Sequence, residues 1–135
     1  MSRYLEIVSL NRPYFTGTDD LNRAMLSCNY YATAAQPVDK FEEEIGRILF
    51  DAGLGVFNTN MFIGPPSTVK EGVGPFITII DTGGLSPLET HNGDKYERMS
   101  FQIIVRANDR KAARTRALAI WRALDGRRNL TVVAA

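Results

Sequence analysis

Residues able to carry chemistry are few in this chain of 135 residues. The single histidine, His91, falls in a polar stretch that offers no cysteine and no Gly-x-Ser-x-Gly nucleophile as a partner. The single cysteine, Cys28, excludes an intrachain disulfide, and together with one histidine it leaves a Cys/His zinc site out of reach. Asp81 and Glu89 are carboxylates suited to acid and base roles, but their spacing fixes no distance between them. These residues predict no catalytic centre and no metal site.

The glycine pair Gly83-Gly84 is the one candidate for a phosphate-binding loop. It lacks the spacing and the Lys-Ser/Thr of such a loop and does not open a helix, so a turn is the favoured interpretation. Cys28 lies on the apolar stripe of a predicted helix, where cysteine commonly serves as a small core residue. We therefore expect no bound cofactor and no enzymatic activity.

The composition is that of an ordinary soluble domain, with 44% apolar and 23% charged residues. The net charge of +1 argues neither for nor against a polyanionic partner. No apolar run approaches the ~20 residues of a membrane-spanning helix, and the first residues lack a signal-peptide pattern. The sequence predicts a soluble protein in the cytoplasm, without a membrane partner.

The positions of the charged residues along the chain are more informative than the net charge. Seven of the sixteen basic residues lie within residues 110–128: Arg110, Lys111, Arg114, Arg116, Arg122, Arg127 and Arg128. One interpretation is a solvated helix face. Another pairs these residues with the acidic run Glu42, Glu43 and Glu44, either within one chain or between copies in a ring. A third is contact with DNA phosphates. The sequence leaves all three open.

The elements that must position these residues centre on residues 96–124. Apolar side chains alternate along a predicted strand at Met99, Phe101, Ile103, Val105 and Ala107. A helical stripe follows at Ala113, Ala117, Ile120, Trp121 and Leu124, capped by Asn108 or Asp109 and ended at Gly126. We expect Phe101 and Trp121 to meet in the core between the strand and the helix.

A second helix is predicted over residues 38–52. Asp39 and Glu42 form a capping box, and Gly53 ends the helix. Its apolar stripe is Phe41, Ile45, Ile48, Leu49 and Ala52. Short strands are predicted at residues 60–63, 75–80 and 129–133, with a break over residues 81–87. The connections 64–75 and 83–95 are rich in glycine, proline or polar residues, and we expect both to be exposed and mobile.

The first 37 residues are the hardest to interpret. An apolar segment spans residues 4–10, and Asp19 or Asp20 is suited to cap a helix with the stripe Leu21, Ala24, Met25 and Cys28. This segment either packs on the chain's own core or forms an arm on a neighbouring copy. We predict an N-terminal extension at 1–37 and an α+β domain at 38–135. The domain is expected to have an antiparallel sheet of about four strands with two helices on one face.

Three stretches, residues 41–55, 76–87 and 96–107, resemble the tail terminator or minor capsid proteins that join head and tail in long-tailed phages. The helix with Ala112, Ala113, Ile120, Trp121, Leu124, Asp125 and Gly126 extends the resemblance, which covers residues 38–133. Its most specific parts are the Thr-Gly-Gly-x-x-Pro turn at 82–87 and the Gln-x-x-Val-Arg-Ala strand end at 102–107.

The resemblance implies a structural virion protein of the neck, assembled in the host cytoplasm. It implies a hexameric ring that ends tail-tube polymerisation and joins the tail to the head. Implied partners are further copies, the tail tube protein, the head-side connector or stopper, and genomic DNA passing through the lumen without sequence-specific contact. Candidate interface residues are Glu42, Glu43, Glu44, Lys70, Glu71, Leu85, Leu88, Arg110, Arg114 and Arg122. Alternatives are a head-completion or adaptor protein, or a non-viral α+β protein-binding module.

Overall fold

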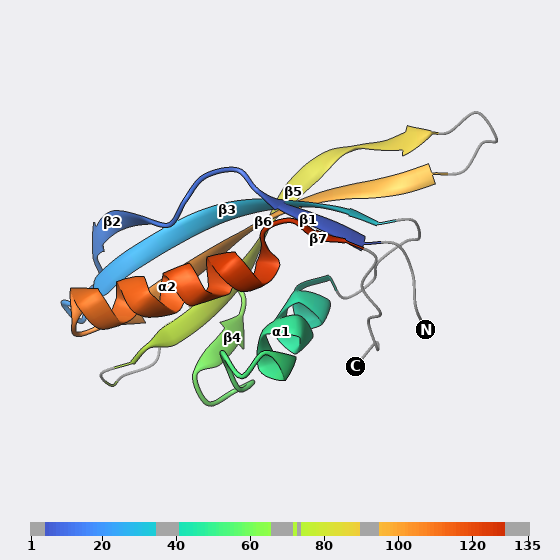
Figure 1. The fold of residues 1–135 in the computed structure, drawn as a ribbon. Coiled ribbons are helices and arrows are strands. Elements are labelled where there is room, and N and C mark those ends of the chain that lie inside the picture. The colour runs from blue at the N-terminus through green and yellow to red at the C-terminus, as the bar shows by residue number, and fades with distance from the viewer. Residues whose placement is uncertain (1–4, 35–40, 66–71, 73, 90–94, 129–135) are drawn as a thin grey trace.

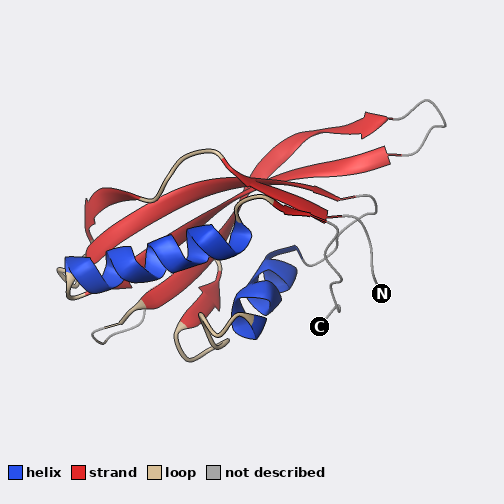
Figure 2. Cartoon of the chain, in the orientation of Figure 1, coloured by secondary structure: helices blue, strands red, loops and turns tan. Residues whose placement is uncertain are grey.

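A computed structural model describes residues 5–34, 41–65, 72, 74–89 and 95–128. Within these ranges the fold is α+β, with two helices on one face of a twisted sheet (Figures 1 and 2). The helices are α1 (Phe41–Asp51) and α2 (Arg110–Leu124). The strands are β1 (Leu5–Ser9), β2 (Tyr14–Thr18), β3 (Ala24–Ala34), β4 (Met61–Ile63), β5 (Phe76–Glu89), β6 (Lys95–Ala107) and β7 (Arg127–Arg128). The α+β class and the two helices agree with the sequence prediction.

The sheet is larger than predicted and is mixed. Its strand order is β4-β5-β6-β3-β1-β7, and β2 pairs with β3 outside this path. All pairs are antiparallel except β4 with β5, which run parallel. The prediction of about four antiparallel strands is therefore wrong in number and partly in direction. Three of the additional strands come from the N-terminal segment.

Residues 5–34 belong to the sheet and to the chain's own core. β3 pairs with β6 from Ala24↔Ala107 to Ala34↔Glu97, and Ile7 of β1 is fully buried. The helix predicted from Asp19 or Asp20 onwards is wrong, and residues 5–34 do not form a separate arm. The buried side chains of β3 alternate: Ala24, Leu26, Cys28, Tyr30 and Ala32. The boundary predicted at residue 37 lies outside the described residues.

The predicted strand and helix over residues 96–124 are confirmed as β6 and α2. Asp109 is the N-cap of α2, and its carboxylate accepts a hydrogen bond of 3.0 Å from the Lys111 N–H. Gly126 has a positive φ of 76°, which glycine adopts without a Cβ clash at a helix end. The buried residues of α2 are Ala113, Ala117, Ile120 and Leu124.

Helix α1 covers the β4–β5 side of the same sheet face (Figure 1). Phe41, Ile45, Ile48 and Leu49 are buried as predicted, and Gly53 has a φ of 75° beyond the helix end. Ala52 is exposed instead of completing the stripe, because the helix ends at Asp51. Asp39 of the predicted capping box lies outside the described residues.

Strand β5 continues through the predicted break at residues 81–87. The register shifts between Asp81 and Gly83, where Gly83 has a φ of 103° and donates its N–H to the Asp81 carboxylate at 2.7 Å. A bulge with glycine at the strained position lets the ladder resume instead of ending it. Beyond the bulge, β5 and β6 extend as a two-stranded ribbon past both helices (Figure 1). The described parts of segment 83–95 are thus strand, not loop.

The centre of the core is aromatic, although not with the predicted pair. Phe101 is fully buried, and its ring stacks on Tyr30 at 5.1 Å between centroids and meets the Phe41 ring edge-on at 5.2 Å. Trp121 is half-buried at the rim, where its indole N–H donates to the Ser9 hydroxyl at 2.9 Å. The predicted Phe101–Trp121 centre is replaced by Tyr30, a residue from the segment that was predicted as a helix.

Candidate interaction surfaces

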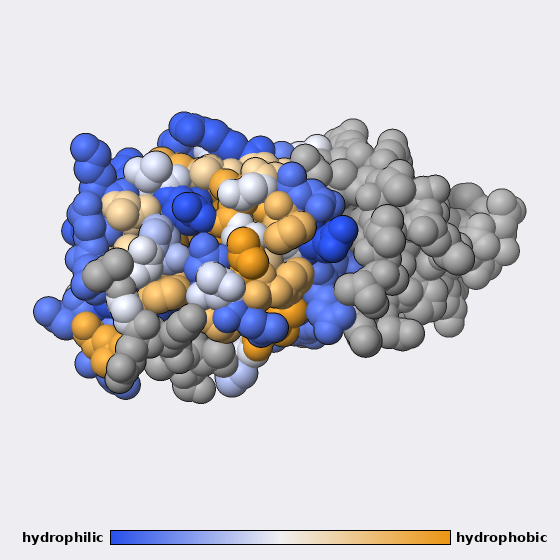
Figure 3. Space-filling model, turned by 90° about the horizontal axis from the view of Figure 1, so that it is seen from below, coloured by the Kyte–Doolittle hydropathy of each residue, from blue (hydrophilic) through white to orange (hydrophobic). Residues whose placement is uncertain are grey.

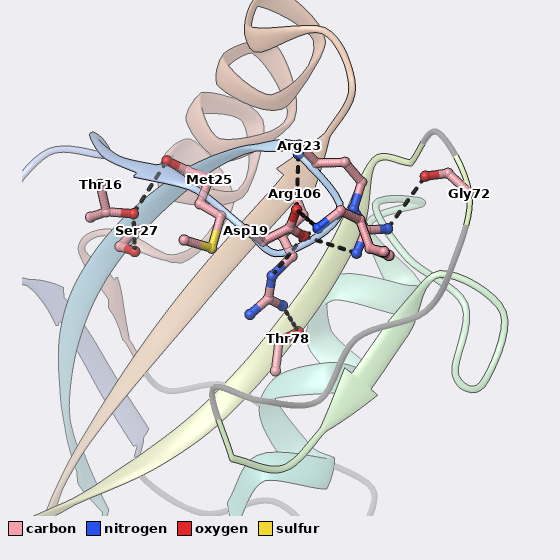
Figure 4. A network of polar contacts seen from close by, with 9 residues as sticks. Thr16, Asp19, Arg23, Met25, Ser27, Gly72, Thr78 and Arg106 are labelled. Carbon is pink, nitrogen blue, oxygen red and sulfur yellow. Dashed lines mark hydrogen bonds and ion pairs between the residues drawn. The ribbon is translucent and has the colours of Figure 1, made fainter.

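The most buried charges form a network at the end of the sheet where β2 turns into β3 (Figure 4). Asp19 accepts hydrogen bonds from the backbone N–H and the Nε of Arg23, both at 2.9 Å. The Asp19 carboxylate also lies 3.6 Å from Nε of Arg106, whose Nη1 donates to the Thr78 hydroxyl at 2.9 Å. Arg23 donates in turn to the Gly72 carbonyl at 3.3 Å. The network joins the β2–β3 turn to β5, β6 and the chain before β5.

Burial sets the electrostatics of this network. The side chains of Asp19, Arg23 and Arg106 are 6%, 1% and 4% exposed. Burial alone would raise the pKa of Asp19, but the hydrogen bonds and charge of Arg23 outweigh it and lower that pKa. For Arg106, burial lowers the pKa, Asp19 opposes that shift and Arg23 adds to it. The carboxylate is thus held ionised between two guanidinium groups.

A second polar cluster fixes the end of α2 on β1. Asp125 accepts hydrogen bonds from the Ser9 N–H at 2.9 Å and the Ser9 hydroxyl at 2.8 Å. The Gly126 N–H donates to the Ile7 carbonyl at 2.8 Å, and the Arg12 guanidinium lies 5.1 Å from the Trp121 ring centroid. These contacts, together with the Arg116 hydrogen bond to the Leu54 carbonyl, set the position of α2 on the sheet.

The predicted acidic and basic residues lie on different helices. Glu42 and Glu43 are half-buried on α1, whereas Glu44 is buried at 6% exposure. Arg110, Arg114 and Arg122 are exposed on α2. Because α1 contacts β4 and β5 while α2 contacts β1, β3 and β6, the two charged surfaces lie toward opposite edges of the sheet.

The remaining predicted interface residues lie outside the two helices. Lys70 and Glu71 lie outside the described residues, as does His91. Leu85 and Leu88 belong to the β5 part of the projecting ribbon, where they pair with Arg98 and Tyr96. The described backbone places Leu85 and Leu88 in this ribbon and not on either helix.

Two hollows lie side by side at the β4 edge. One, of about 350 Å³, is lined by Glu43, Phe57, Asn58, Met61 and Ile63. The other, of about 310 Å³, is lined by Glu42, Ile63, Gly64, Pro65, Ile79, Ile80 and Asp81. Ile63 separates them and is 37% exposed. The face seen in Figure 3 shows apolar patches among hydrophilic residues. This edge is apolar with an acidic border.

The opposite edge, at β2, combines aromatic and basic groups. Phe15 is 40% exposed, and the Arg110 guanidinium lies 4.0 Å from its ring centroid. Tyr14 on the same strand is 45% exposed. Every β2 residue except Gly17 is exposed to solvent. The sequence analysis gave Phe15, with Tyr4, Leu5 and Val8, as the apolar residues of a possible arm on a neighbouring copy, and it did not identify Ile63 as an interface residue.

The free cysteine lies in the interior of the protein. Cys28 is buried, and its thiol donates to the Asn11 carbonyl at 3.1 Å. Burial raises the pKa of this thiol, which disfavours the nucleophilic thiolate. Among the described residues, no group of three or more His, Cys, Asp or Glu side chains is arranged to hold a metal ion. Of the two described helices, neither has the length and apolar character that a membrane crossing requires.

A comparison with protein-family models shows which family the chain belongs to. The model of the bacteriophage tail terminator protein family matches residues 48–131, which is more than half of the chain. The chain belongs to this family. The resemblance read from the sequence is thereby confirmed, and the match runs from within α1 past the end of β7. Neither the curated proteins nor the solved structures compared with this tail terminator include a match.

The match covers the C-terminal part of the terminator's sheet and not its N-terminal strands. It begins at Ile48 and includes β4, β5, β6 and α2, so the central strand pair and its covering helix lie inside it. Strands β1 to β3 precede it and complete the same sheet. As a member of a structural phage-tail family, the terminator is a tail protein.

Proposed function

We propose that the protein is a structural component of the virion that closes the head-proximal end of the phage tail tube. Copies of the chain form a ring, expected to be hexameric, on the last layer of tube protein and stop further polymerisation. The observation that carries this proposal is the family match over residues 48–131. The protein does no chemistry in this role, and its surfaces act by fit and charge.

The distribution of charge supports a contact between unlike surfaces. The acidic side chains of α1 lie toward one edge of the sheet, and the basic side chains of α2 lie toward the other. A contact that joins unlike surfaces of identical chains is head-to-tail, and it gives a closed ring when the rotation between neighbours closes. Exposed ion pairs contribute about 0 to 1 kcal/mol each, so charge sets register while apolar contacts supply affinity.

The proposed partners follow from the position of the ring. One face meets the tail tube protein, and the other meets the connector or stopper on the head side. Genomic DNA passes through the lumen with contacts to phosphate only, for which the basic face of α2 is the candidate. The projecting β5–β6 ribbon, with Leu85 and Leu88, is the candidate contact with a partner outside the ring, because a two-stranded ribbon standing alone is marginally stable.

Deletion of the gene from the phage genome tests the function directly. Tails made without the protein are expected to vary in length and to remain separate from filled heads. Supplying the wild-type protein from a plasmid restores uniform tails and joined particles, which electron microscopy of negatively stained lysates measures. Tails of normal length that still fail to join heads would contradict the terminator role and favour an adaptor of the neck.

Imaging of the assembled particle tests the location and the copy number. Antibody or gold labelling of a tagged protein is expected at the junction of head and tail, and a reconstruction of the neck should show one ring of this chain. A signal at the distal tail tip, or one copy per particle, would contradict the proposal.

A further inference from the structure

We infer that neighbouring copies in the ring join by side-chain docking, with Phe15 and Arg110 of one copy seated in the hollow bordered by Glu42 and Asp81 of the next. This inference rests on the proposed ring and names the two surfaces that meet in it. The contact consists of charge pairing over apolar surface and adds no strand to either sheet. Each copy carries both surfaces, so each copy binds two neighbours.

The first surface is an aromatic ring with a cation on it, at the β2 edge. The Phe15 ring is 40% exposed, and the guanidinium of the exposed Arg110 lies 4.0 Å from its centroid. Phe15 pairs with Leu26, which belongs to the core under the helices, so the ring lies on the helix-bearing side of the sheet. Within the described residues, Arg110 has no carboxylate partner. A neighbouring chain is therefore able to supply one.

The second surface is a hollow with carboxylates on its border. Its volume of about 310 Å³ equals that of roughly ten water molecules in the liquid, which is room for a guanidinium group with an aromatic ring beside it. Glu42 and Asp81 border it, and neither has an ion pair within the described residues. Asp81 pairs with the fully buried Phe101, so it lies on the helix-bearing side, as Phe15 does. The other lining residues are uncharged: Ile63, Gly64, Pro65, Ile79 and Ile80.

One chain cannot bring its own two surfaces together. β2 and β4 lie on opposite sides of the sheet, with β3, β6 and β5 between them (Figure 1). Four strand spacings separate them by roughly 19 Å, and Arg110 is held over Phe15 at the β2 edge. The contact therefore requires a second copy. Because the two surfaces differ, the contact is head-to-tail, the type that builds closed rings.

Apolar surface accompanies the charges on both sides of the junction. Phe15 contributes its exposed ring, and Ile63 on the border of the hollow is 37% exposed. An exposed ion pair by itself contributes little to affinity, whereas removal of apolar side chains from water adds a favourable contribution. Opposite charges then select the partner surface and disfavour a contact between two copies of the same surface.

Reversal of the charges tests the junction. Arg110→Glu and Glu42→Arg are supplied from plasmids, singly and together in one chain, to phage that lacks the gene, and electron microscopy counts joined particles with uniform tails. Each single reversal sets like charges against each other in every junction. We therefore expect the junction to weaken at least about tenfold and joined particles to fall with it. The double variant restores opposite charges and should return particle numbers to near the wild-type level.

Co-expression of the two single variants distinguishes contact between copies from contact within one copy. In a ring that alternates the two variants, every junction again joins opposite charges, although neither variant forms such a junction with itself. We expect joined particles to recover, and native mass spectrometry of rings released from tails should show equal numbers of the two chains. Asp81→Arg is combined with Arg110→Glu in the same way, as a second reversal on the border of the hollow.

Arg122→Glu is the matched control. It makes the same charge change at another exposed position of α2, which lies roughly 18 Å along the helix from Arg110. It should leave joined particles at the wild-type level. Circular dichroism melts of the purified variants are expected to match the wild type, because all the substituted side chains lie at the surface or its border.

Other outcomes separate this inference from the proposed function. Wild-type particle numbers with Arg110→Glu, with a ring still seen in the neck, would overturn the junction and leave the ring intact. Loss in the single variants without recovery in the double variant or in the mixture would overturn the pairing as well. An equal loss with Arg122→Glu would overturn it by tracing the effect to the charge of α2 as a whole. Uniform tails joined to heads in phage without the gene would overturn the terminator function itself.

Discussion

Two clusters on opposite faces hold this sheet together, and they differ in physical character. On the helix-bearing face, Tyr30, Phe41 and Phe101 pack their rings together. On the open face, Asp19 and Arg106 are joined by charge and hydrogen bonds. The aromatic cluster depends on shape and burial, whereas the ionic network depends on every partner being present. Stability against truncation and stability against pH are therefore expected to reside in different places.

Truncation of the Phe101 ring at the centre of the core should give the largest loss of stability. Phe101→Ala removes a fully buried ring from between Tyr30 and Phe41, and we expect the free energy of unfolding to fall by about 3 to 5 kcal/mol. Phe101→Leu keeps most of the volume and should cost clearly less. Urea denaturation followed by circular dichroism measures both. Equal losses for the two variants would contradict this expectation, because they would show that retained side-chain volume does not replace any of the ring packing.

Removal of the buried carboxylate should give the next largest loss. Asp19→Asn leaves the guanidinium groups of Arg23 and Arg106 without their shared charge partner, at an expected cost of about 3 kcal/mol. The matched control is Asp20→Asn, one residue along and exposed, which should change stability by less than about 0.5 kcal/mol. The same denaturation series compares them, and a similar effect of both substitutions would refute a special role for Asp19.

The pH dependence should distinguish the two clusters. The pKa of Asp19 is lowered in the folded chain, so its stabilisation is complete above the unfolded value of 3.8 and is lost as pH falls through the folded value. We therefore expect the stability difference between wild type and Asp19→Asn to be constant near neutrality and to shrink below about pH 4. For Phe101→Ala the difference should stay level over the same range. Thermal melts at stepped pH test this.

The smallest effect is expected from a single oxygen atom in the aromatic cluster. Within the described residues, the buried Tyr30 hydroxyl has no nitrogen or oxygen partner, and burial, with a smaller contribution from the Cys28 thiol, raises the pKa of this phenol. Tyr30→Phe removes the oxygen and keeps the stacked ring, so we expect stability to rise by about 1 kcal/mol. A drop of similar size in the melting experiment would mean that the hydroxyl is satisfied in solution.

The local sequence pattern was sufficient to predict an element where that element has a clear hydrophobic periodicity and recognisable capping residues. The strand at β6 and the helix α2 follow each other with clear alternation, a clear helical stripe, Asp109 at the start and Gly126 at the end. It was insufficient for β3, where small residues at Ala24 and Cys28 satisfy a helical spacing as well as an alternating one. Pairing with β6, more than sixty residues away, decides between them.

Some features of the interaction surfaces could likewise be predicted from the sequence, and others could not. Charge runs in the sequence located the acidic face of α1 and the basic face of α2, since residues of one helix stay together wherever the helix goes. The burial of Glu44 and the partnership of Asp19 with Arg106 were not accessible, because they depend on how distant segments pack. An arginine after the apolar run Ile103-Ile104-Val105 was the one local sign that a buried partner was needed.

The sequence by itself determined the two helices, the central strand β6, the absence of a recognisable catalytic motif and the membership in the tail terminator family. These rest on local periodicity and on motifs within single segments. The tertiary structure decided that residues 5–34 complete the sheet, with β3 beside β6 and both β1 and β2 paired with β3. Strand order and edge position arise from pairing between segments far apart in the chain. No local pattern specifies which strands become neighbours.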